Sequence, residues 1–161
     1  MFMKPGTAYV YSIYGMYYCF NISSDGDGAA VLVRALEPLE GIDLMRKFRG
    51  FKRQDKGQLL KLKDLCNGPS KLCQAFQINK DELNTEDLTN SSVLWLEKGT
   101  SISESDIVQC KRIGIDGAGK DWADKPLRFY IKNEIYVSVR NKVAELSTVS
   151  NNVMVNGTEH V

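Results

Sequence analysis

Apolar and polar positions alternate from the first residues of the chain, and this period of two predicts β-strands. Residues 7–13 (TAYVYSI) and 16–22 (MYYCFNI) are rich in aromatic and β-branched residues, which favour strands. The segment 29–36 (AAVLVRAL) is almost wholly apolar, so we expect a third strand that is buried on both faces. Turn signals at residues 14–15 and at SSDGDG connect the three, which predicts an antiparallel meander.

The pattern then changes to the spacing of helices. Apolar residues recur at every third position over residues 37–48, which predicts a first helix. The Asn-Gly pair at 67–68 breaks the chain, and Pro69 suits the first turn of a second helix. The acidic, polar segment 79–92 is typical of a loop.

Strand-like patterns return in the last third of the chain. Residues 93–99 (VLWLEKG) and 106–115 (DIVQCKRIGI) predict two strands. Residues 127–139 (LRFYIKNEIYVSV) predict a final hairpin that turns at Asn133. Together the patterns predict an α+β fold: a single mixed domain with an antiparallel sheet flanked by a few helices.

The size and composition agree with one globular domain. The chain has 161 residues, of which 43% are hydrophobic and 25% charged, and its net charge is +1. We expect the domain to span residues 1–143. Residues 144–161 are polar, and we expect a disordered tail because they offer too little apolar surface to pack. The sequence shows neither a signal-peptide pattern nor an apolar run of about 20 residues, the length of a membrane span.

The four cysteines, at positions 19, 66, 73 and 110, lie in apolar or mixed segments. Their even number permits disulfides, but the pattern favours reduced, buried thiols in an intracellular protein. Neither a histidine nor a second cysteine pair lies near Cys66 and Cys73, which argues against a zinc site.

Tyrosines are concentrated near the start of the chain: five of the seven fall between residues 6 and 23. On the first predicted strand Tyr9 and Tyr11 share one face, and Tyr14 lies at the expected hairpin tip. Two interpretations remain open. The rings either pack a sheet face, or they stack on nucleobases and insert between base steps.

Positive charge is concentrated between residues 46 and 63, with very few acids to balance it. This tract, which includes Arg53, is either a solvated surface or a contact with a polyanion. The helix entry NGPSK is either an ordinary cap or an anion site built from backbone N–H groups, Ser70 and Lys71. With the tyrosines, these features favour nucleic-acid binding, and Arg53, Ser70 and Lys71 are candidate contacts to the DNA backbone.

Arg34 is the only charged residue in the apolar segment 29–36. A charge in a buried strand is costly unless it is paired or solvated. Arg34 therefore either reaches solvent from the strand end or faces a polar pocket beside Asn21 on the neighbouring strand.

General acid–base groups are not evident from the residues alone. The only histidine, His160, lies in the predicted tail. Asp25 and Asp27 are typical turn formers, and the carboxylates at 37, 40 and 43 suit a helix start. These patterns indicate a binding module in which no catalytic arrangement is visible.

Several segments, in order along residues 1–140, resemble the alkyladenine (3-methyladenine) DNA glycosylase family. They are MFMKPGTAYVYSIYGMYYCFNIS, GDGAAVLVRALEPLEG, LCNGPSKLCQAFQI, RIGIDGAG and WADKPLRFYI. The resemblance implies a single α+β domain around a curved antiparallel sheet. It also implies hydrolysis of the N-glycosidic bond of alkylated or deaminated purines, without a metal or a cofactor.

The resemblance also implies roles for five residues. Tyr14 matches the tyrosine that enters the minor groove and fills the gap left by the flipped nucleotide. Tyr11 matches an aromatic residue that stacks on the extruded base, and Asn21 matches an amide that disfavours the amino group of normal guanine. Arg34 matches an arginine that helps to hold the attacking water, and Ile113 matches a main-chain carbonyl at that water site.

One part of the family pattern has no counterpart in this sequence. An ETEAY-like segment precedes the matching methionine in the family and supplies the general-base glutamate, a second stacking tyrosine and, slightly later, a pocket histidine. The sequence therefore resembles a truncated form, an alternative product or an incomplete gene model. We expect weak, salt-sensitive DNA binding and slow or absent excision, because a general base typically contributes about 10²–10⁴-fold to a rate.

The resemblance implies double-stranded DNA containing damaged purines as the partner, a monomeric protein and no membrane association. It implies the nucleus as the location in a eukaryote and the cytoplasm otherwise. Two alternatives remain open. One is a non-catalytic nucleic-acid-binding or interaction module whose tyrosines stack on single strands, and the other is an unstable fragment.

Overall fold

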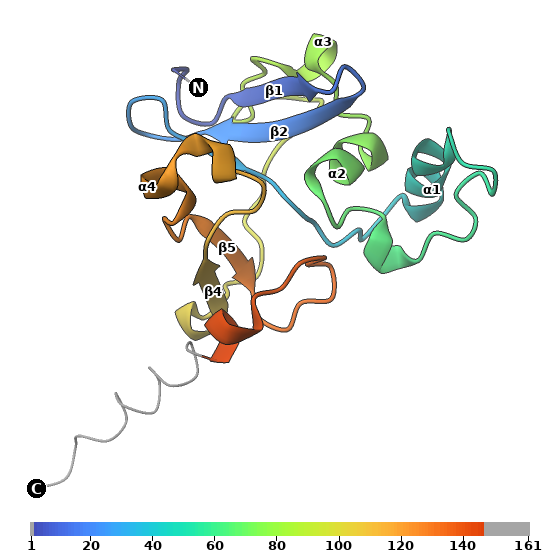
Figure 1. Ribbon diagram of the computed structural model, residues 1–161. Helices are drawn as coiled ribbons and strands as arrows, with labels where there is room; N and C mark the ends of the chain where they lie inside the picture. The colour runs from blue at the N-terminus through green and yellow to red at the C-terminus, as the bar shows by residue number, and fades with distance from the viewer. Residues whose placement is uncertain (1, 147–161) are drawn as a thin grey trace, which may run out of the picture. The chain divides into compact units, whose positions relative to one another are not determined.

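The computed structural model describes residues 2–146 and divides the chain into two compact units, residues 1–98 and 99–161. Both units contain antiparallel strands and short helices, as Figure 1 shows, so the α+β class predicted from the sequence is confirmed. The strands pair into two sheets, of three strands in the first unit and two in the second. None of the helices within residues 2–146 is both long enough and apolar enough to span a bilayer.

The first unit is built on an antiparallel sheet with the strand order β1-β2-β3. Strand β1 (Ala8–Ile13) runs beside β2 (Tyr17–Ser23), as Figure 1 shows. Strand β3 (Ala30–Leu32) pairs with the other edge of β2. The predicted meander and its two turns are therefore confirmed.

Strand β3 differs from its prediction in length and in burial. Only three residues of the segment 29–36 form the strand, and Val31 is 60% exposed, so the expectation of burial on both faces is wrong. Burial on both faces requires a packed layer on each side of the sheet. The described helices of this unit pack on one face only, the face that carries Val10 and Phe20. Val31 pairs with Ile22 and so belongs to this face, but on the edge strand β3 it is left exposed.

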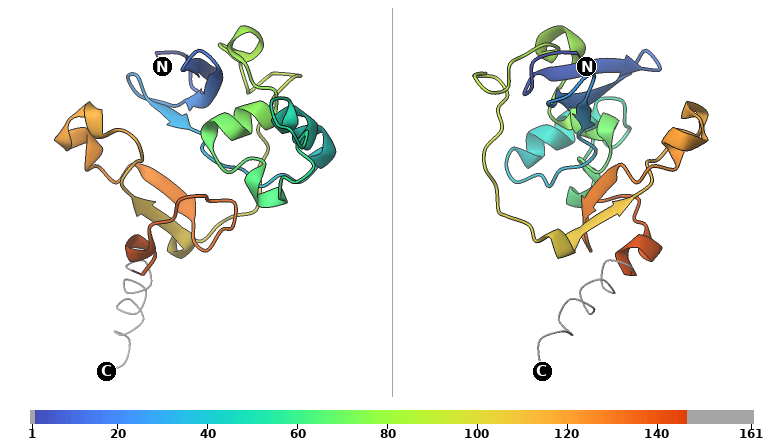
Figure 2. Two further views of the ribbon diagram at one scale, coloured as in Figure 1. Left: turned by 45° about the vertical axis from the view of Figure 1, so that its right-hand side comes forward. Right: turned by 90° about the vertical axis from the view of Figure 1, so that its left-hand side faces the viewer.

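Two helices cover this core face of the sheet. Helix α1 (Ile42–Gly50) lies beside α2 (Pro69–Ala75) in the left-hand view of Figure 2, and α2 packs on β2. A 3-10 turn, η1 (Leu62–Asp64), leads into α2. The buried side chains form one apolar cluster, which includes Leu65 and Leu72. Removal of this surface from water is the main source of stability for the unit.

The helix starts agree with the predictions to different degrees. Helix α2 begins at Pro69 as expected, because proline is well suited to the first helical position. Helix α1 begins at Ile42, later than predicted, because Gly41 before it has a left-handed φ of 67°. Leu39 is consequently outside the helix and 76% exposed, whereas Met45 is buried.

The outer edge of β1 is covered by the segment that follows a short helix, α3 (Lys80–Leu83). The Ala8 N–H donates to the Glu86 carbonyl at 2.8 Å, and the Val10 N–H donates to Asn84 Oδ1 at 3.0 Å. The sequence pattern had predicted only a loop here. These bonds satisfy backbone groups that an uncovered edge strand would expose.

Residues 51–61 form a tightly closed loop at the end of α1. A Cβ atom on Gly57 would lie 2.1 Å from the Arg46 carbonyl oxygen, and one on Gly50 would lie 2.2 Å from the Lys56 backbone. The two glycines therefore allow the backbone of the loop to contact the helix directly. The part of the basic tract that follows α1 is therefore a loop, as its composition suggests, and this loop is folded back against the helix.

The second unit contains strands β4 (Ile107–Cys110) and β5 (Arg128–Ile131), which pair antiparallel. Its short helical turns are η2 (Glu104–Asp106), η3 (Asp116–Ala118) and α4 (Lys120–Ala123). The strand predicted over 106–115 is thus present in part. The strand predicted over residues 93–99 is absent from the structure.

The predicted final hairpin is also wrong, although its turn is present. Asn133 has a left-handed φ of 61°, but β5 pairs with β4 and not with the segment after the turn. Side chains hold that segment instead. The buried Arg128 guanidinium donates through Nη1 to the Val139 carbonyl at 2.8 Å. An arginine anchor of this kind has no periodic signature in the sequence.

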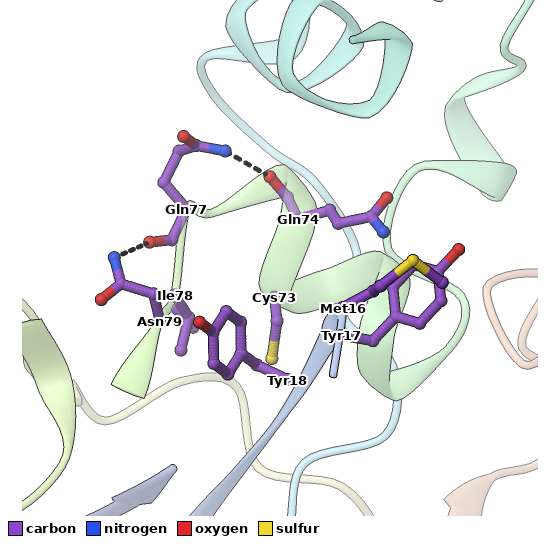
Figure 3. Close-up of a pocket in the computed structure, with 8 residues that line it drawn as sticks. All are labelled: Met16, Tyr17, Tyr18, Cys73, Gln74, Gln77, Ile78 and Asn79. Carbon is purple, nitrogen blue, oxygen red and sulfur yellow. Dashed lines mark hydrogen bonds between the residues drawn. The ribbon is translucent and has the colours of Figure 1, made fainter. Parts of the chain in front are cut away.

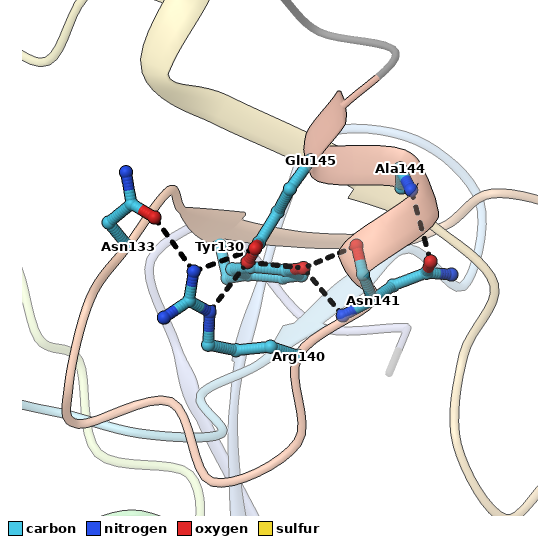
Figure 4. Close-up of polar contacts among 6 residues, drawn as sticks. All are labelled: Tyr130, Asn133, Arg140, Asn141, Ala144 and Glu145. Carbon is cyan, nitrogen blue, oxygen red and sulfur yellow. Dashed lines mark hydrogen bonds and ion pairs between the residues drawn. The ribbon is translucent and has the colours of Figure 1, made fainter.

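A polar network joins the last described residues of the second unit to Tyr130 of β5, as Figure 4 shows. Arg140 donates from Nε and Nη2 to the Glu145 carboxylate, both at 2.7 Å. The Tyr130 hydroxyl donates to Glu145 Oε1 at 3.1 Å and accepts from the Asn141 N–H at 2.8 Å. Glu145 is buried. Residues 147–161 lie outside the described residues, so the disordered tail and the domain end at residue 143 stay predictions.

Replacing Glu145 by glutamine is expected to reduce the acid sensitivity of the second unit. The hydrogen bonds from Arg140 hold the pKa of the Glu145 carboxyl below its ordinary value. A depressed folded-state pKa contributes stability above the ordinary glutamate pKa of about 4.3. That contribution is lost as the pH falls through the lowered pKa. Thermal melts over this acidic range measure the effect.

The matched control is Glu104→Gln, because Glu104 is exposed in the same unit. This variant should retain the acid sensitivity of the wild-type protein. Equal pH dependence of the melting temperature in wild type and Glu145→Gln would contradict the assignment of this acid sensitivity to the Glu145 carboxylate.

All four cysteines are free and buried, as the sequence predicted. Burial raises the pKa of the Cys66 thiol, and it raises that of Cys73 to about 12. The thiols therefore contribute to packing as small apolar groups.

Candidate functional site

Tyr14 projects from the tip of the β1–β2 hairpin and is 89% exposed. The Met16 N–H donates to the Ile13 carbonyl at 3.3 Å, and the two central residues, Tyr14 and Gly15, have φ values of 53° and 66°. Positive φ at both positions matches the twist of a two-stranded hairpin. A left-handed tyrosine costs about 1–3 kcal/mol, and strain of this kind clusters at functional sites. An exposed ring recovers none of that cost by packing.

The face of the sheet opposite the core carries two more of the predicted site residues, Tyr11 and Asn21. In the strand register Tyr9 lies opposite Asn21, and Tyr11 lies opposite Cys19. Since alternate residues point to one face, Tyr9, Tyr11, Cys19 and Asn21 share it, whereas Val10 points into the core. The Tyr9 and Tyr11 rings are 5.5 Å apart between centroids, with 32° between their planes.

Asn21 is buried on this face, and its orientation is fixed. Its Nδ2 donates to the Tyr9 carbonyl oxygen at 3.1 Å. An amide has two N–H groups and one carbonyl oxygen, so a second N–H and Oδ1 remain for another partner. The orientation follows from the strand pairing, because Tyr9 is the direct neighbour of Asn21.

Arg34 lies close to Tyr11 on the same face. The Val33 N–H donates to the Phe20 carbonyl at 3.1 Å, which continues the strand pairing beyond Leu32. Alternation then directs Val33 to the core and Arg34 to the face of Tyr11. Burial and a hydrogen bond with Cys19 raise the pKa of Tyr11 to about 12, and the positive charge of Arg34 opposes that rise. Tyr11 is therefore a neutral phenol at physiological pH.

This arrangement can hold a flat, polar molecule. It offers an aromatic ring from Tyr11, an oriented amide from Asn21 and a cation from Arg34. The strand register puts neither a carboxylate nor a histidine among the described residues of this face. The described groups can thus stack, hydrogen-bond and attract negative charge, but they supply no general base.

The entry of α2 places Ser70 and Lys71 at the start of the helix. Lys71 Nζ donates to Asn67 Oδ1 at 2.7 Å, and Asn67 Nδ2 donates to Asp64 Oδ1 at 3.0 Å. The buried Asn67 therefore holds the lysine ammonium beside the helix entry. The N-cap residue is Gly68, which has no side chain with which to cap the helix.

Arg53 has a structural partner in the loop at the end of α1. Its guanidinium donates to both Asp55 carboxylate oxygens, at 2.8 and 3.1 Å. Asp55 also accepts from the N–H groups of Gly57 and Leu59. The hydrogen bond from Arg53 is the main cause that lowers the pKa of Asp55 to about 2. The Arg53 charge is thus balanced within the loop.

Ile113 belongs to the second unit, in the loop after β4. It is 38% exposed and precedes Gly114, which has a left-handed φ of 72°. Tyr11, Asn21 and Arg34 belong to the first unit. The predicted meeting of Ile113 with these three residues stays a prediction.

A pocket near the tip of the hairpin was missed by sequence reasoning. It has a volume of about 190 Å³ and lies between the start of β2 and the end of α2 (Figure 3). Gln77 Nε2 donates to the Gln74 carbonyl at 3.0 Å, and Asn79 Nδ2 donates to the Gln77 carbonyl. The signal available was the pair of glutamines inside the apolar stretch LCQAFQI. The lining residues are Met16, Tyr17, Tyr18, Cys73, Gln74, Gln77, Ile78 and Asn79.

Comparison with a family model and with individual relatives points to the same family of proteins. The model of the methylpurine-DNA glycosylase family matches residues 1–135. The DNA-3-methyladenine glycosylase of Homo sapiens is 54% identical over 150 residues, which cover 92% of this chain and 50% of the human protein. The protein of that name from Mus musculus is 53% identical over 148 residues, covering 90% of this chain and 44% of the mouse protein. The chain therefore spans about half the length of these relatives.

Proposed function

Because the chain belongs to the methylpurine-DNA glycosylase family, we propose that it recognises damaged purines in double-stranded DNA for hydrolytic removal. The proposed substrate class comprises alkylated and deaminated purines whose N-glycosidic bond is cleaved during base excision repair. The observation that carries the proposal is the exposed, strained Tyr14 at the end of a sheet whose free face bears Tyr11, Asn21 and Arg34.

In the proposed complex Tyr14 enters the duplex and occupies the position of the flipped nucleotide. The extruded purine stacks on Tyr11, which its burial and its contact with Tyr9 hold in place. Asn21 contacts the polar edge of the base through its second N–H and its Oδ1, the amide groups that are not bonded to Tyr9. A normal base that presents a donor to the remaining N–H of Asn21 leaves both donors unpaired, which is costly in a buried site.

Arg34 is proposed to act at the bond that breaks. A guanidinium there can donate hydrogen bonds that hold the attacking water, and its positive charge stabilises the negative charge that develops on the leaving base. The Ile113 carbonyl is proposed as a second contact for this water. Activation of the water needs a base, so we expect this chain to excise slowly or not at all while it retains lesion recognition.

Contacts with the DNA backbone are proposed for Ser70, Lys71 and Arg53. Lys71 is the strongest of the three, because Asn67 holds its ammonium beside the helix entry. Arg53 would have to share its charge between a phosphate and Asp55. We further propose that the protein acts as a monomer, and in the nucleus if the source is eukaryotic.

The test is binding of the chain to labelled duplexes that differ by a single base. One duplex carries hypoxanthine or ethenoadenine, and the other is undamaged. We expect about 10-fold tighter binding to the lesion duplex and weaker binding to both as salt is raised. Tyr11→Leu should remove most of the preference, whereas Ser12→Ala, which alters the opposite face of β1, should not. Release of the free base, followed on the same duplexes, reports excision.

Equal affinity for the two duplexes in the wild-type chain would contradict the proposal. The alternative function, a non-catalytic module for single strands, is favoured by the absence of a carboxylate on the described face. It predicts that single-stranded DNA binds more tightly than the lesion duplex. The same titration with an unpaired strand therefore separates the two functions.

A further inference from the structure

Helix α1 has two apolar faces, and only one of them is covered. Ile42 and Met45 pack into the core of the first unit. At 100° per residue Leu44, Phe48 and Phe51 form a second stripe that adjoins the inner face at the half-buried Phe48 and turns away from the core at Leu44 and Phe51. Leu44 is 57% exposed and Phe51 is 88% exposed. A surface helix normally shows charged or polar residues on this side.

The surroundings of this outer stripe, Leu44–Phe48–Phe51, are positively charged. Lys47 lies within the stripe, and Lys52 follows Phe51 directly. Both are exposed, and neither forms an ion pair among residues 2–146. The acid at the rim, Asp43, is paired with Arg46 at 3.1 Å.

The stripe is presented on a rigid base. The close approach of Gly57 to the Arg46 backbone fixes the loop against α1. Asp55 fixes the inside of the loop through Arg53 and two backbone N–H groups. Phe51 itself keeps helical dihedral angles of −52° and −37°. A partner would therefore meet a preformed surface and lose little free energy to ordering it.

We propose that the stripe Leu44–Phe48–Phe51 and its lysines dock an amphipathic helix of another protein, one whose apolar face is bordered by glutamates or aspartates. An apolar stripe at helical spacing is the pattern that a helix buries against a second helix. Acidic residues beside the partner's stripe complement Lys47 and Lys52 and set its orientation. DNA phosphates would neutralise the lysines but would leave Leu44 and Phe51 in water.

A membrane surface is less suited to this stripe than a helix. Interfacial helices insert a wide apolar face with Trp, Phe or Leu along their length. The outer stripe of α1 has three apolar side chains on little more than two turns, and the opposite side of the helix is fixed in the core.

The test uses a fluorescent peptide of about 18 residues, long enough to form a helix, with leucines at helical spacing and glutamates elsewhere. A scrambled peptide of the same composition lacks the stripe. Anisotropy titrations of the wild-type chain should give about 10-fold tighter binding for the striped peptide. The double variant Leu44→Ser/Phe51→Ser should lose about 10-fold in affinity for it. Lys47→Gln/Lys52→Gln should weaken binding and reduce its dependence on salt.

Val93→Ser is the matched control, since Val93 is an apolar side chain of the same unit that is 70% exposed. It should bind the striped peptide as the wild type does. Melting curves of each variant verify folding, which serine should not impair at these exposed positions. Undamaged duplex DNA and phosphatidylserine vesicles complete the comparison. Equal binding of the two peptides, or a loss of DNA or vesicle binding in Leu44→Ser/Phe51→Ser, would overturn the proposal.

Discussion

Gly57→Ala is expected to lower the free energy of unfolding of the first unit by about 3 kcal/mol. Gly57 has a φ of 82°, a conformation that costs an L-residue with a Cβ about 1–2 kcal/mol. The added Cβ would also lie 2.1 Å from the Arg46 carbonyl oxygen, a backbone atom that cannot rotate away. Forced overpacking of this kind costs about 1–3 kcal/mol more. Urea unfolding measures the sum.

The control for this prediction separates the dihedral cost from the collision. Gly41 has a similar φ of 67°, it caps the same helix, and a Cβ there would meet nothing within 4 Å. Gly41→Ala should therefore lose only about 1 kcal/mol. If the two variants were equally stable, the tight contact between the loop and α1 would be wrong.

Tyr14→Ala is expected to weaken binding to the lesion duplex by about 10- to 100-fold, since stacking on a base contributes about 1–3 kcal/mol. Binding to undamaged duplex should fall far less, because no gap opens there for the ring to fill. Tyr14→Phe should resemble the wild type, as the proposed role belongs to the ring. Competition titrations with the two duplexes give both affinities for each variant.

Trp95→Ala provides the matched control, because Trp95 is an aromatic residue of the same unit that is 55% exposed. It should bind both duplexes as the wild type does. Equal losses on both duplexes in Tyr14→Ala would exclude the role in base flipping. Stability offers an independent measurement: Tyr14→Asn should be at least as stable as the wild type, because asparagine tolerates the left-handed φ better than tyrosine.

The hairpin could be predicted from the sequence because its signals are local. Period-two alternation assigned Tyr11 and Val10 to opposite faces, and glycine next to Tyr14 marked the turn. Pro69 marked the start of α2 for an equally local reason. Arg34 stood out as the one charge of an apolar segment, and the strand pairing directs it to the face of Tyr11.

Features that depend on distant segments could not be predicted in this way. Val31 shares the core face with Ile22 but is exposed on the edge strand, and no strand pattern states how far the helices extend over that face. The partner of β5 is decided by pairing with β4 and by the Arg128 anchor, not by the turn at Asn133. The outer stripe of α1 was also missed, since recurrence at every third residue picked out Phe48 but neither Leu44 nor Phe51.

The buried thiols have a consequence for chemical durability. Under the proposed function the protein meets the electrophiles that methylate DNA, and sulfur reacts with them as the thiolate. Burial raises the pKa of Cys73 to about 12, so this thiol stays protonated at neutral pH. Since all four sulfur atoms are also shielded by packing, the protein should survive doses of methylating agent that inactivate enzymes with accessible cysteines.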